Sequence, residues 1–170
     1  MTGIAPQVLI VMGVSGSGKT TIAVDLAKRL GWPFQEGDEL HPPANVEKMR
    51  SGIPLDDADR WPWLDRVAAW IDARLADGHG GIVTCSALKR SYRDRLLGMR
   101  LGVRFVFLHA SPEVLAARLA ARRGHYMPAS LLGSQIATLE LPTPDEHPLT
   151  VEVGGTPDEV VDAIMEKLAA

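Results

Sequence analysis

The stretch that decides the fold reads Val8-Leu-Ile-Val-Met-Gly13-Val-Ser-Gly-Ser-Gly-Lys19-Thr20. Its first five residues form a short apolar run, which is typical of a buried parallel strand. The next eight residues match the pattern G-x-x-x-x-G-K-[ST] at every fixed position. Apolar residues then recur at helical spacing as far as Leu30, where Gly31 ends the pattern. The sequence therefore predicts a buried strand, a glycine-rich turn and an amphipathic helix in direct succession.

This turn has the physical properties of a phosphate-binding loop. Glycines let the backbone bend so that successive N–H groups point at phosphate oxygens, and the N-terminus of the next helix adds its positive end. Lys19 is expected to reach the outer phosphates, and the Thr20 hydroxyl is expected to ligate Mg²⁺. The alternative is a glycine-rich turn without a ligand, but motif and context together favour the loop. The predicted nucleoside triphosphate site comprises Gly13, Val14, Ser15, Gly16, Ser17, Gly18, Lys19, Thr20 and Thr21.

The composition excludes several other classes of protein. With 170 residues, 46% hydrophobic and 23% charged, the chain can bury a core without disulfides or a structural metal. Intrinsic disorder, collagen-like repeats and disulfide-stapled scaffolds are therefore excluded. The net charge of −3 argues against a general nucleic-acid binder. Residues 89–123 nevertheless hold nine basic and two acidic residues, which suits a polyanion such as a nucleoside triphosphate, the alternative being a solvated basic face.

Cysteine content and hydropathy indicate the compartment. Cys85 is the one cysteine of the sequence, so no intramolecular disulfide is possible, and this fits the reducing cytoplasm. It lies in an apolar run and is predicted to be a buried strand residue rather than a nucleophile. No apolar run approaches the roughly 20 residues that span a membrane. The run at Val8–Met12 is too short for a signal peptide and has no basic residue before it. We expect a cytoplasmic protein with no membrane partner.

The rest of the chain alternates between strand and helix patterns. Strands are expected at residues 8–12, 33–36, 81–86, 103–108 and 150–153, and helices at 20–30, 42–50, 65–76, 89–99, 112–121 and 157–168. This order predicts an α/β fold of three layers, α/β/α, around a central five-stranded parallel sheet. Residues 42–60 and 124–150 break the alternation and are rich in charge, proline and glycine. They are predicted to be functional insertions.

Carboxylates that assist phosphoryl transfer are expected after the second strand. The third and fourth strands end without an acidic residue, whereas Glu36-Gly-Asp38 follows the second. Parallel strands end at the same edge of a sheet, where ligands bind, so both carboxylates are expected to face the phosphate loop. Asp38 is predicted to accept the proton of the attacking hydroxyl, and Glu36 or Asp38 to hold a magnesium-bound water. The alternative is a pair of solvated loop carboxylates.

Three further blocks resemble the gluconokinase signature. Residues 37–64 resemble its run G-D-x-L-H-P-x-x-N-x-x-K-M-x-x-G-x-P-L-x-D-x-D-R-x-P-W-L, and residues 85–94 resemble C-S-A-L-K-x-x-Y-R-D. Residues 122–128, followed by L-L-G-S-Q at 131–135 and L-E at 139–140, resemble its lid block. Departures fall in that lid block, at Tyr126, Ile136 and Leu141. The match spans nearly the whole chain, and the family is more distantly similar to shikimate and adenylate kinases.

The resemblance implies an activity and an organisation. The activity is the transfer of a phosphoryl group from ATP to D-gluconate with Mg²⁺, which gives ADP and 6-phospho-D-gluconate. The organisation is one kinase domain over residues 1–170, with an acceptor-binding insertion at about 38–64 and a lid at about 122–145. The resemblance also implies a homodimer, and the charge and hydropathy described above predict neither nucleic acid nor a membrane as partner.

The chemistry of gluconate points to particular side chains in these blocks. Its primary alcohol needs a proton acceptor, for which Asp38 is the candidate, and its other hydroxyls are candidates for His41. Its carboxylate needs a cation, and the bidentate fork of arginine suits it best. The candidate cations are Arg60, Lys89 and Arg93.

Each assignment has a structural alternative. Arg60 can pair with Asp56, Asp57 or Asp59, and Arg93 with Asp94 or Glu113. His41 can fix the turn before Pro42, and Asn45 and Lys48 can cap or solvate the following helix. Trp61 and Trp63 are predicted to anchor the core of the acceptor region rather than to stack on sugar.

Two arginines near the predicted lid fit the charge that phosphoryl transfer develops. Arg118 and Arg122 are four residues apart on one helix face, where like charges repel unless an anion lies between them. The resemblance assigns this place to lid arginines that bind ATP, and the alternative is a solvated helix end. Lys19, Asp38 and Arg122 are therefore the predicted catalytic residues.

Overall fold

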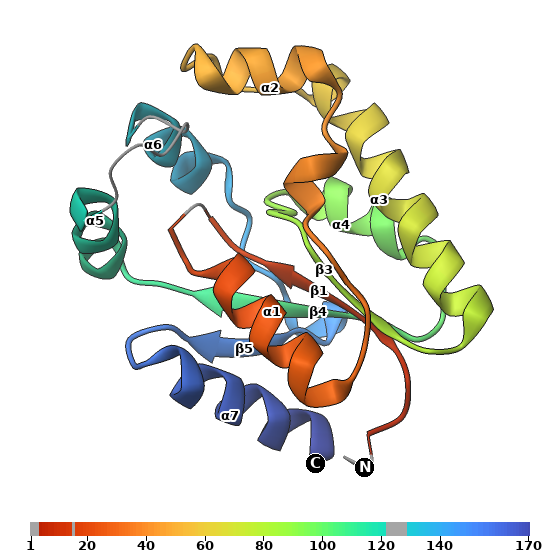
Figure 1. Ribbon diagram of the computed structural model, residues 1–170. Coiled ribbons are helices and arrows are strands. Elements are labelled where there is room, and N and C mark those ends of the chain that lie inside the picture. Colours follow the sequence, from red (N-terminus) through yellow and green to blue (C-terminus); the bar gives the residue numbers. More distant parts are fainter. Residues whose placement is uncertain (1–3, 15, 122–128) are drawn as a thin grey trace.

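The computed structural model describes residues 4–14, 16–121 and 129–170 (Figure 1). Five parallel strands form one sheet in the order β2-β3-β1-β4-β5. The strands are β1 (Val8–Met12), β2 (Phe34–Gln35), β3 (Gly81–Thr84), β4 (Val103–His109) and β5 (Leu149–Glu152). In the central strand, Ile10 pairs with Val83 of β3 and with Phe105 of β4. The predicted five-stranded parallel sheet is confirmed.

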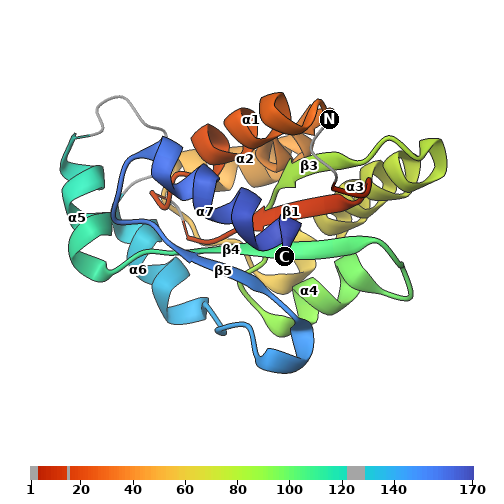
Figure 2. The ribbon, with the colours of Figure 1, turned by 90° about the horizontal axis from the view of Figure 1, so that it is seen from below.

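Helices cover both faces of this sheet (Figures 1 and 2). The α-helices are α1 (Lys19–Leu30), α2 (Pro43–Arg50), α3 (Asp57–Asp77), α4 (Arg90–Leu97), α5 (Pro112–Ala121), α6 (Ala129–Thr138) and α7 (Pro157–Ala169). Two short 3₁₀ helices are η1 (Gly37–Leu40) and η2 (Pro144–Glu146). Helices α1 and α7 pack on one face, and α3 and α4 pack on the other. The three predicted layers are therefore present.

Strand β1 supplies side chains to both halves of the core. Val8, Ile10 and Met12 face α3 and α4, whereas Leu9 and Val11 face α1 and α7. All five are fully buried. Burial of an apolar side chain of this size contributes about 1.5–3 kcal/mol. A continuous apolar run is therefore what a central strand covered on both faces requires.

Helix α3 begins at Asp57, eight residues before the predicted start at residue 65. The Asp56 carboxylate accepts from Asp59 N at 2.8 Å, and the Asp59 carboxylate accepts from Asp56 N at 3.0 Å. This capping box stabilises the new start. Pro62 lies inside the helix and has no N–H to donate, so one backbone hydrogen bond is missing in the second turn. Helix α6 was not predicted, because residues 124–150 were expected to be irregular.

The carboxyl edge of the sheet gathers the segments that were predicted to be functional. The loop after β1, helices α2, α5 and α6, and the turn after β3 all lie beyond the strand ends (Figure 1). Within the residues described, no helix is long and apolar enough to cross a bilayer.

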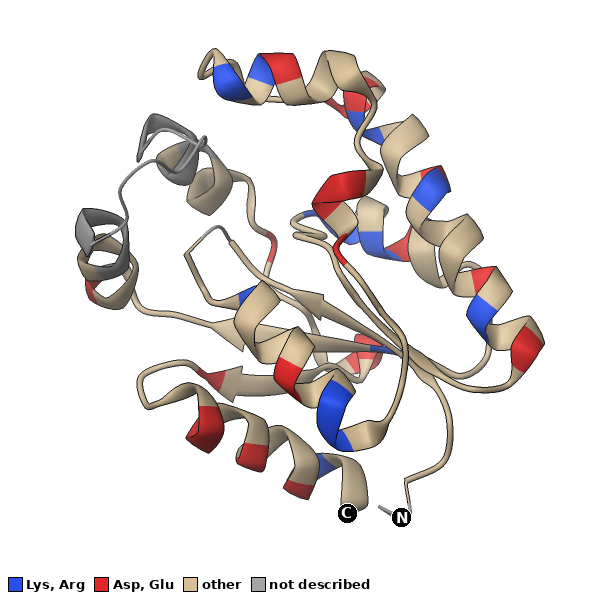
Figure 3. Cartoon of the chain, viewed as in Figure 1, with Lys and Arg blue, Asp and Glu red and all other residues tan. Residues whose placement is uncertain are grey.

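The basic residues between positions 89 and 123 are largely paired with acidic residues. Red and blue segments lie close together on α3 and α4, while acidic residues dominate the outer side of α7 (Figure 3). The pairs are Lys89–Asp57, Arg90–Asp145, Arg93–Glu146, Arg95–Asp65 and Arg100–Asp72. Most of these cations therefore belong to surface or interior ion pairs rather than to a patch that attracts a polyanion.

Candidate functional site

The glycine-rich turn forms a tight loop between β1 and α1. A Cβ atom on Gly13 would lie 2.9 Å from both the Leu108 carbonyl oxygen and Ser17 Oγ, and its φ is +148°. Glycine is therefore required here, since other residues rarely adopt this conformation. The Ser17 hydroxyl donates to the Val14 carbonyl oxygen at 2.7 Å inside the loop. Ser15 lies outside the described residues.

Lys19 extends back over this loop from the first residue of α1. Its Nζ donates to the carbonyl oxygens of Gly13 at 2.9 Å and Val14 at 3.1 Å. An ammonium group thus lies at the mouth of the loop, where a phosphate chain needs positive charge. Thr20 and Thr21 follow on α1 and are exposed.

Glu36 is the carboxylate nearest the loop. The Thr20 hydroxyl donates to Glu36 Oε2 at 2.5 Å, and the Thr84 hydroxyl donates to the other carboxylate oxygen. Thr84 in turn accepts from Gly37 N at 2.9 Å. A Cβ atom on Gly37 would lie 1.7 Å from the Thr84 carbonyl oxygen, so only glycine lets β2 end this close to β3. The hydrogen bond between Thr20 and Glu36 therefore joins the predicted Mg²⁺ ligand to the carboxylate that was predicted to hold a magnesium-bound water.

The oxygens of Thr20 and Glu36 fit Mg²⁺. Both are hard oxygen donors, and Mg²⁺ takes one or two protein oxygens together with waters and phosphate oxygens. The described residues contain no group of three or more His, Cys, Asp or Glu side chains that could enclose a metal. The donor set is therefore suited to an ion that arrives with a nucleotide rather than to a resident metal.

Asp38 projects from η1 with half of its side chain exposed. Its Oδ1 lies 3.9 Å from Nε2 of His41. Trp63 Nε1 donates to the Gly37 carbonyl oxygen at 2.8 Å and so ties η1 to α3. Trp63 is almost fully buried, in agreement with its prediction as a core anchor.

His41 is buried between η1, α2 and α3. Its ring stacks on Trp63 with the centroids 4.0 Å apart, and its Nδ1 lies 3.1 Å from Asn45 Nδ2. Burial and the positive charge of Arg60 lower the pKa of His41 to about 4. The ring is therefore neutral near pH 7. The Asn45 amide nitrogen is directed inward, since it also donates to the Asp59 carbonyl oxygen at 2.9 Å.

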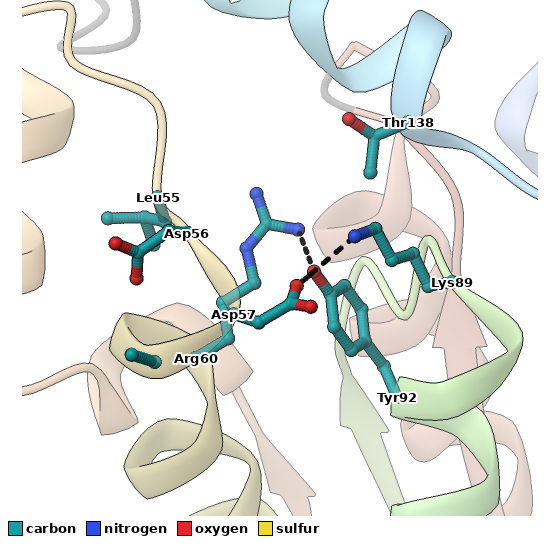
Figure 4. A pocket seen from close by; sticks show the side chains of 8 residues that line it. Leu55, Asp56, Asp57, Arg60, Lys89, Tyr92 and Thr138 are labelled. Atoms are coloured by element: carbon teal, nitrogen blue, oxygen red, sulfur yellow. Dashed lines mark hydrogen bonds and ion pairs between the residues drawn. The ribbon is translucent and has the colours of Figure 1, made fainter.

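Arg60 and Lys89 point into one pocket of about 480 Å³ (Figure 4). An Nη atom of Arg60 donates to the Tyr92 hydroxyl at 3.1 Å, and the guanidinium lies 5.2 Å from the Tyr92 ring centre. No carboxylate among the described residues is within ion-pair distance of Arg60, contrary to the alternative that it pairs with a neighbouring aspartate. The pocket is lined by Leu55, Asp56, Asp57, Ala58, Arg60, Lys89, Tyr92 and Thr138.

Asp57 and Tyr92 complete this pocket, and the candidate list drawn from the sequence lacked both. The Tyr92 hydroxyl donates to Asp57 Oδ1 at 2.5 Å, and Lys89 Nζ lies 3.2 Å from the same oxygen. The hydrogen bond from Tyr92, followed by that from Lys89, lowers the pKa of Asp57. Burial and the hydrogen bond to Asp57 raise the pKa of Tyr92 to about 12. Both residues belong to sequence blocks that resemble the family signature, which was the available signal.

Arg93 was predicted to bind substrate, and the structure places it in the interior with a carboxylate partner. It is 1% exposed, and its Nε donates to Glu146 at 2.6 Å. One Nη donates to the carbonyl oxygens of Ala87 at 2.8 Å and Leu88 at 3.2 Å. The alternatives Asp94 and Glu113 were not its partners either. Arg93 therefore fixes the turn after β3, in which Ala87 has a left-handed φ of +47°.

Cys85 follows β3 directly and is buried. Burial raises the pKa of the Cys85 thiol to about 12, and the charges of Asp38, Lys19 and Arg60 all act on it. The thiol therefore stays protonated, in agreement with the prediction that Cys85 is not a nucleophile. The loop lysine follows β1 and Asp38 follows β2, so both lie at the carboxyl edge of the parallel sheet.

The remaining predicted residues are Lys48, Arg118 and Arg122. Lys48 pairs with Asp59 at 2.7 Å, which agrees with a structural role. Arg118 lies on α5. Arg122 lies outside the described residues, as does the part of the predicted 122–145 lid that runs from residue 122 to residue 128.

Comparison with known proteins gives this site a family. The model of a family described as an AAA domain matches residues 8–142. A gluconokinase from Gluconobacter oxydans is 55% identical over 168 residues, which cover 99% of this chain and 94% of the relative. The chain belongs to the gluconokinase family. The sequence-based resemblance is thereby confirmed.

Solved structures agree with membership of the gluconokinase family. A gluconokinase from Sinorhizobium meliloti superposes with a TM-score of 0.88 at 47% identity, over 98% of this chain and 93% of that one. Shikimate kinase from Aquifex aeolicus superposes with a TM-score of 0.56 at 18% identity, over 95% of each chain. The second likeness concerns the fold, and it agrees with the predicted distant similarity to shikimate kinases.

Proposed function

We propose that this protein transfers the γ-phosphoryl group of ATP to the primary hydroxyl of D-gluconate, giving ADP and 6-phospho-D-gluconate. The observation that carries the proposal is that Lys19, Asp38 and Arg60 belong to segments at one edge of the sheet: the start of α1 after β1, η1 after β2, and the pocket that Lys89 lines after β3. These residues supply a phosphate cation, a proton acceptor and a carboxylate-binding cation. Family membership at 55% identity supports the same acceptor.

The nucleotide would lie on the loop after β1. Backbone N–H groups of the loop and the N-terminus of α1 face its phosphates, and Lys19 exchanges its loop carbonyl partners for phosphate oxygens. Arg118 and Arg122 are proposed to contact ATP from the lid. Thr20 and Glu36 are the residues that would hold Mg²⁺, which would neutralise phosphate charge during the transfer.

Gluconate would lie between Asp38 and the pocket of Arg60. Arg60 binds the carboxylate, because its guanidinium has donors left over after Tyr92 and has no carboxylate partner among the residues described. Lys89 assists while held by Asp57. The acceptor oxygen attacks the γ-phosphorus, the bond to the bridging β-phosphate oxygen breaks, and the hydroxyl proton passes to Asp38.

An ADP-release assay with Mg-ATP tests this function. D-gluconate, shikimate, nucleoside monophosphates and a no-acceptor control are compared at equal concentration. Turnover is expected with D-gluconate and not with the other acceptors. Turnover with shikimate or a nucleotide would overturn the acceptor assignment while keeping the loop chemistry. ATP binding without turnover on any acceptor would indicate a nucleotide-dependent binding module instead.

Organisation and assembly extend the proposal. Residues 1–170 are proposed to be one kinase domain, with residues 38–64 as its acceptor-binding insertion and residues 122–145 as its lid. A cytoplasmic homodimer that binds neither nucleic acid nor membranes stays a prediction from the sequence. Light scattering of the purified chain measures the dimer directly.

A further inference from the structure

The acceptor region holds the His41 ring in one orientation. The ring lies on Trp63 with an interplanar angle of 18°, and its side chain is 3% exposed. Trp63 is itself tied to the Gly37 carbonyl oxygen. The ring therefore cannot turn without breaking the stack and opening a buried site.

The partners of Asn45 determine which nitrogen of this ring carries the proton. Asn45 Nδ2 donates to the Asp59 carbonyl oxygen at 2.9 Å, and a carbonyl oxygen can only accept. The atom is therefore the amide nitrogen. The same nitrogen lies 3.1 Å from His41 Nδ1, so Nδ1 accepts a hydrogen bond. A neutral imidazole has one donor and one acceptor, which places the proton on Nε2.

This Nε2–H group faces Asp38. The distance from Nε2 to Asp38 Oδ1 is 3.9 Å, which is too long for a direct hydrogen bond. One oxygen atom that lies to the side of the line joining Nε2 and Oδ1 can be about 2.8 Å from both atoms. Such an oxygen accepts from Nε2–H and donates its own proton to the carboxylate. A hydroxyl group meets both requirements, whereas an ammonium group cannot accept.

We propose that His41 binds the hydroxyl that is phosphorylated, with its Nε2–H donating to the acceptor oxygen while that hydroxyl donates to Asp38. The inference rests on the proposed function and deepens it. Two hydrogen bonds at one oxygen fix the direction of its remaining lone pair, which must point at the γ-phosphate for in-line attack. A neutral ring does this without the positive charge that would weaken Asp38 as a proton acceptor.

Heteronuclear NMR of the histidine rings in the full chain tests the tautomer and the contact. A non-hydrolysable ATP analogue and D-gluconate are added in turn, and the exposed His79 serves as the reference ring. We expect His41 to be a neutral Nε2–H tautomer whose proton signal moves downfield with gluconate and not with the analogue alone. A Nδ1–H tautomer, a charged ring or a signal that gluconate leaves unchanged would overturn the proposal.

Two substitutions separate hydrogen bonding from packing. His41→Phe keeps a ring on Trp63 but loses the donor, whereas His41→Gln keeps an N–H donor. His41→Phe is expected to lower kcat/KM for gluconate about tenfold, with the KM for ATP unchanged, and His41→Gln to recover most of the loss. His79→Phe is the matched control. Equal kinetics in both His41 variants, or losses that follow their melting temperatures, would show a structural role instead.

The wild-type assay keeps the two proposals apart. If the wild-type protein does not phosphorylate gluconate, the proposed function fails. If it does and His41→Phe is as active as wild type, the role of His41 fails while the proposed function stands.

Discussion

The nucleotide loop and the acceptor region lie at the same edge of the sheet but are built differently. The loop is continuous in the chain, and its internal hydrogen bonds join residues three to six positions apart. The acceptor region is assembled from η1, α2, α3 and α4, with Arg60 and Tyr92 32 positions apart and Glu36 and Thr84 48 positions apart. A local site depends on its own backbone, whereas an assembled site depends on how several helices pack.

Removal of the loop cation should have the largest effect and should be confined to the loop. Lys19→Ala is expected to lower kcat/KM about 10⁴-fold, in the range of other cations that stabilise phosphoryl transfer. The melting temperature should change little, because the loop keeps its backbone conformation and the hydrogen bond from the Ser17 hydroxyl to Val14. Steady-state kinetics and circular dichroism provide the measurements. An active Lys19→Ala protein would contradict the loop assignment.

Substitution of the proton acceptor in the acceptor region should lower turnover without affecting nucleotide binding at the loop. Asp38→Asn keeps the shape of the side chain but removes the proton acceptor, so kcat is expected to fall about 10³-fold. ATP affinity, measured by calorimetry, should remain that of the wild type. Near-normal turnover would remove Asp38 from the proton-acceptor role.

Helix α4 carries a buried arginine and an exposed arginine, so substitutions at the two positions compare how much interior and surface ion pairs contribute to the free energy of unfolding. Arg93→Met removes the cation closest to the buried Glu146 carboxylate and leaves it Arg90 at 3.6 Å, so a cost of about 3 kcal/mol of unfolding free energy is expected. Arg95 pairs with Asp65 on the exposed side of the same helix, so Arg95→Met is the matched control, with a cost of about 0.5 kcal/mol or less. Urea unfolding measures both. Equal costs would mean that the interior pair has no special role.

Acid should weaken the acceptor region through His41. Its pKa is about 4 in the folded protein and 6.5 in a model peptide, so the unfolded chain binds the proton first. This part of the stability is full above pH 6.5 and is lost as the pH falls from 6.5 toward 4, by about 3 kcal/mol at most. Urea titrations should give a shallower pH slope for His41→Gln than for wild type. Parallel slopes would refute the explanation.

The smallest effect should appear at the carboxylate of the acceptor. Arg60→Ala is expected to raise the KM for gluconate about 10–30-fold and to change kcat and the KM for ATP less, since a charged hydrogen-bond pair is lost. Arg60→Lys should restore only part of the affinity, because lysine keeps the positive charge but lacks the bidentate fork. An unchanged KM in the alanine variant would leave Arg60 as a partner of Tyr92 and nothing more.

The sequence predicted best the parts of the molecule that are continuous in the chain. Strand β1 and the loop follow from one apolar run and one motif, and the start of α7 follows from Thr156, whose side chain accepts from Glu159 N. These features depend on neighbours within a few positions. The same holds for Asp38, which is placed by the end of its own strand.

The assembled parts were predicted less well. The guanidinium of Arg93 and the carboxylate of Glu146 are 53 positions apart, and nothing local in either segment indicates the other. Arg93 therefore looked like a free cation at the sheet edge. Helix α3 was predicted to begin at residue 65, whereas the reciprocal caps at Asp56 and Asp59 start it at Asp57, ahead of Pro62. The pocket role of Tyr92 likewise required contacts between α3 and α4.

The strand order sets the distance between the chain segment that leaves β1 and the chain segment that leaves β2. Strand β3 lies between β2, which precedes Asp38, and β1, which precedes the loop. Neighbouring parallel strands are about 4.8 Å apart, so the two chain segments leave the sheet about 10 Å from each other. Backbone hydrogen bonds hold this gap open whatever residues surround it. Substitutions in η1, α2, α3 and α4 can therefore change the acceptor preference while the spacing between the loop and the segment of Asp38 stays the same.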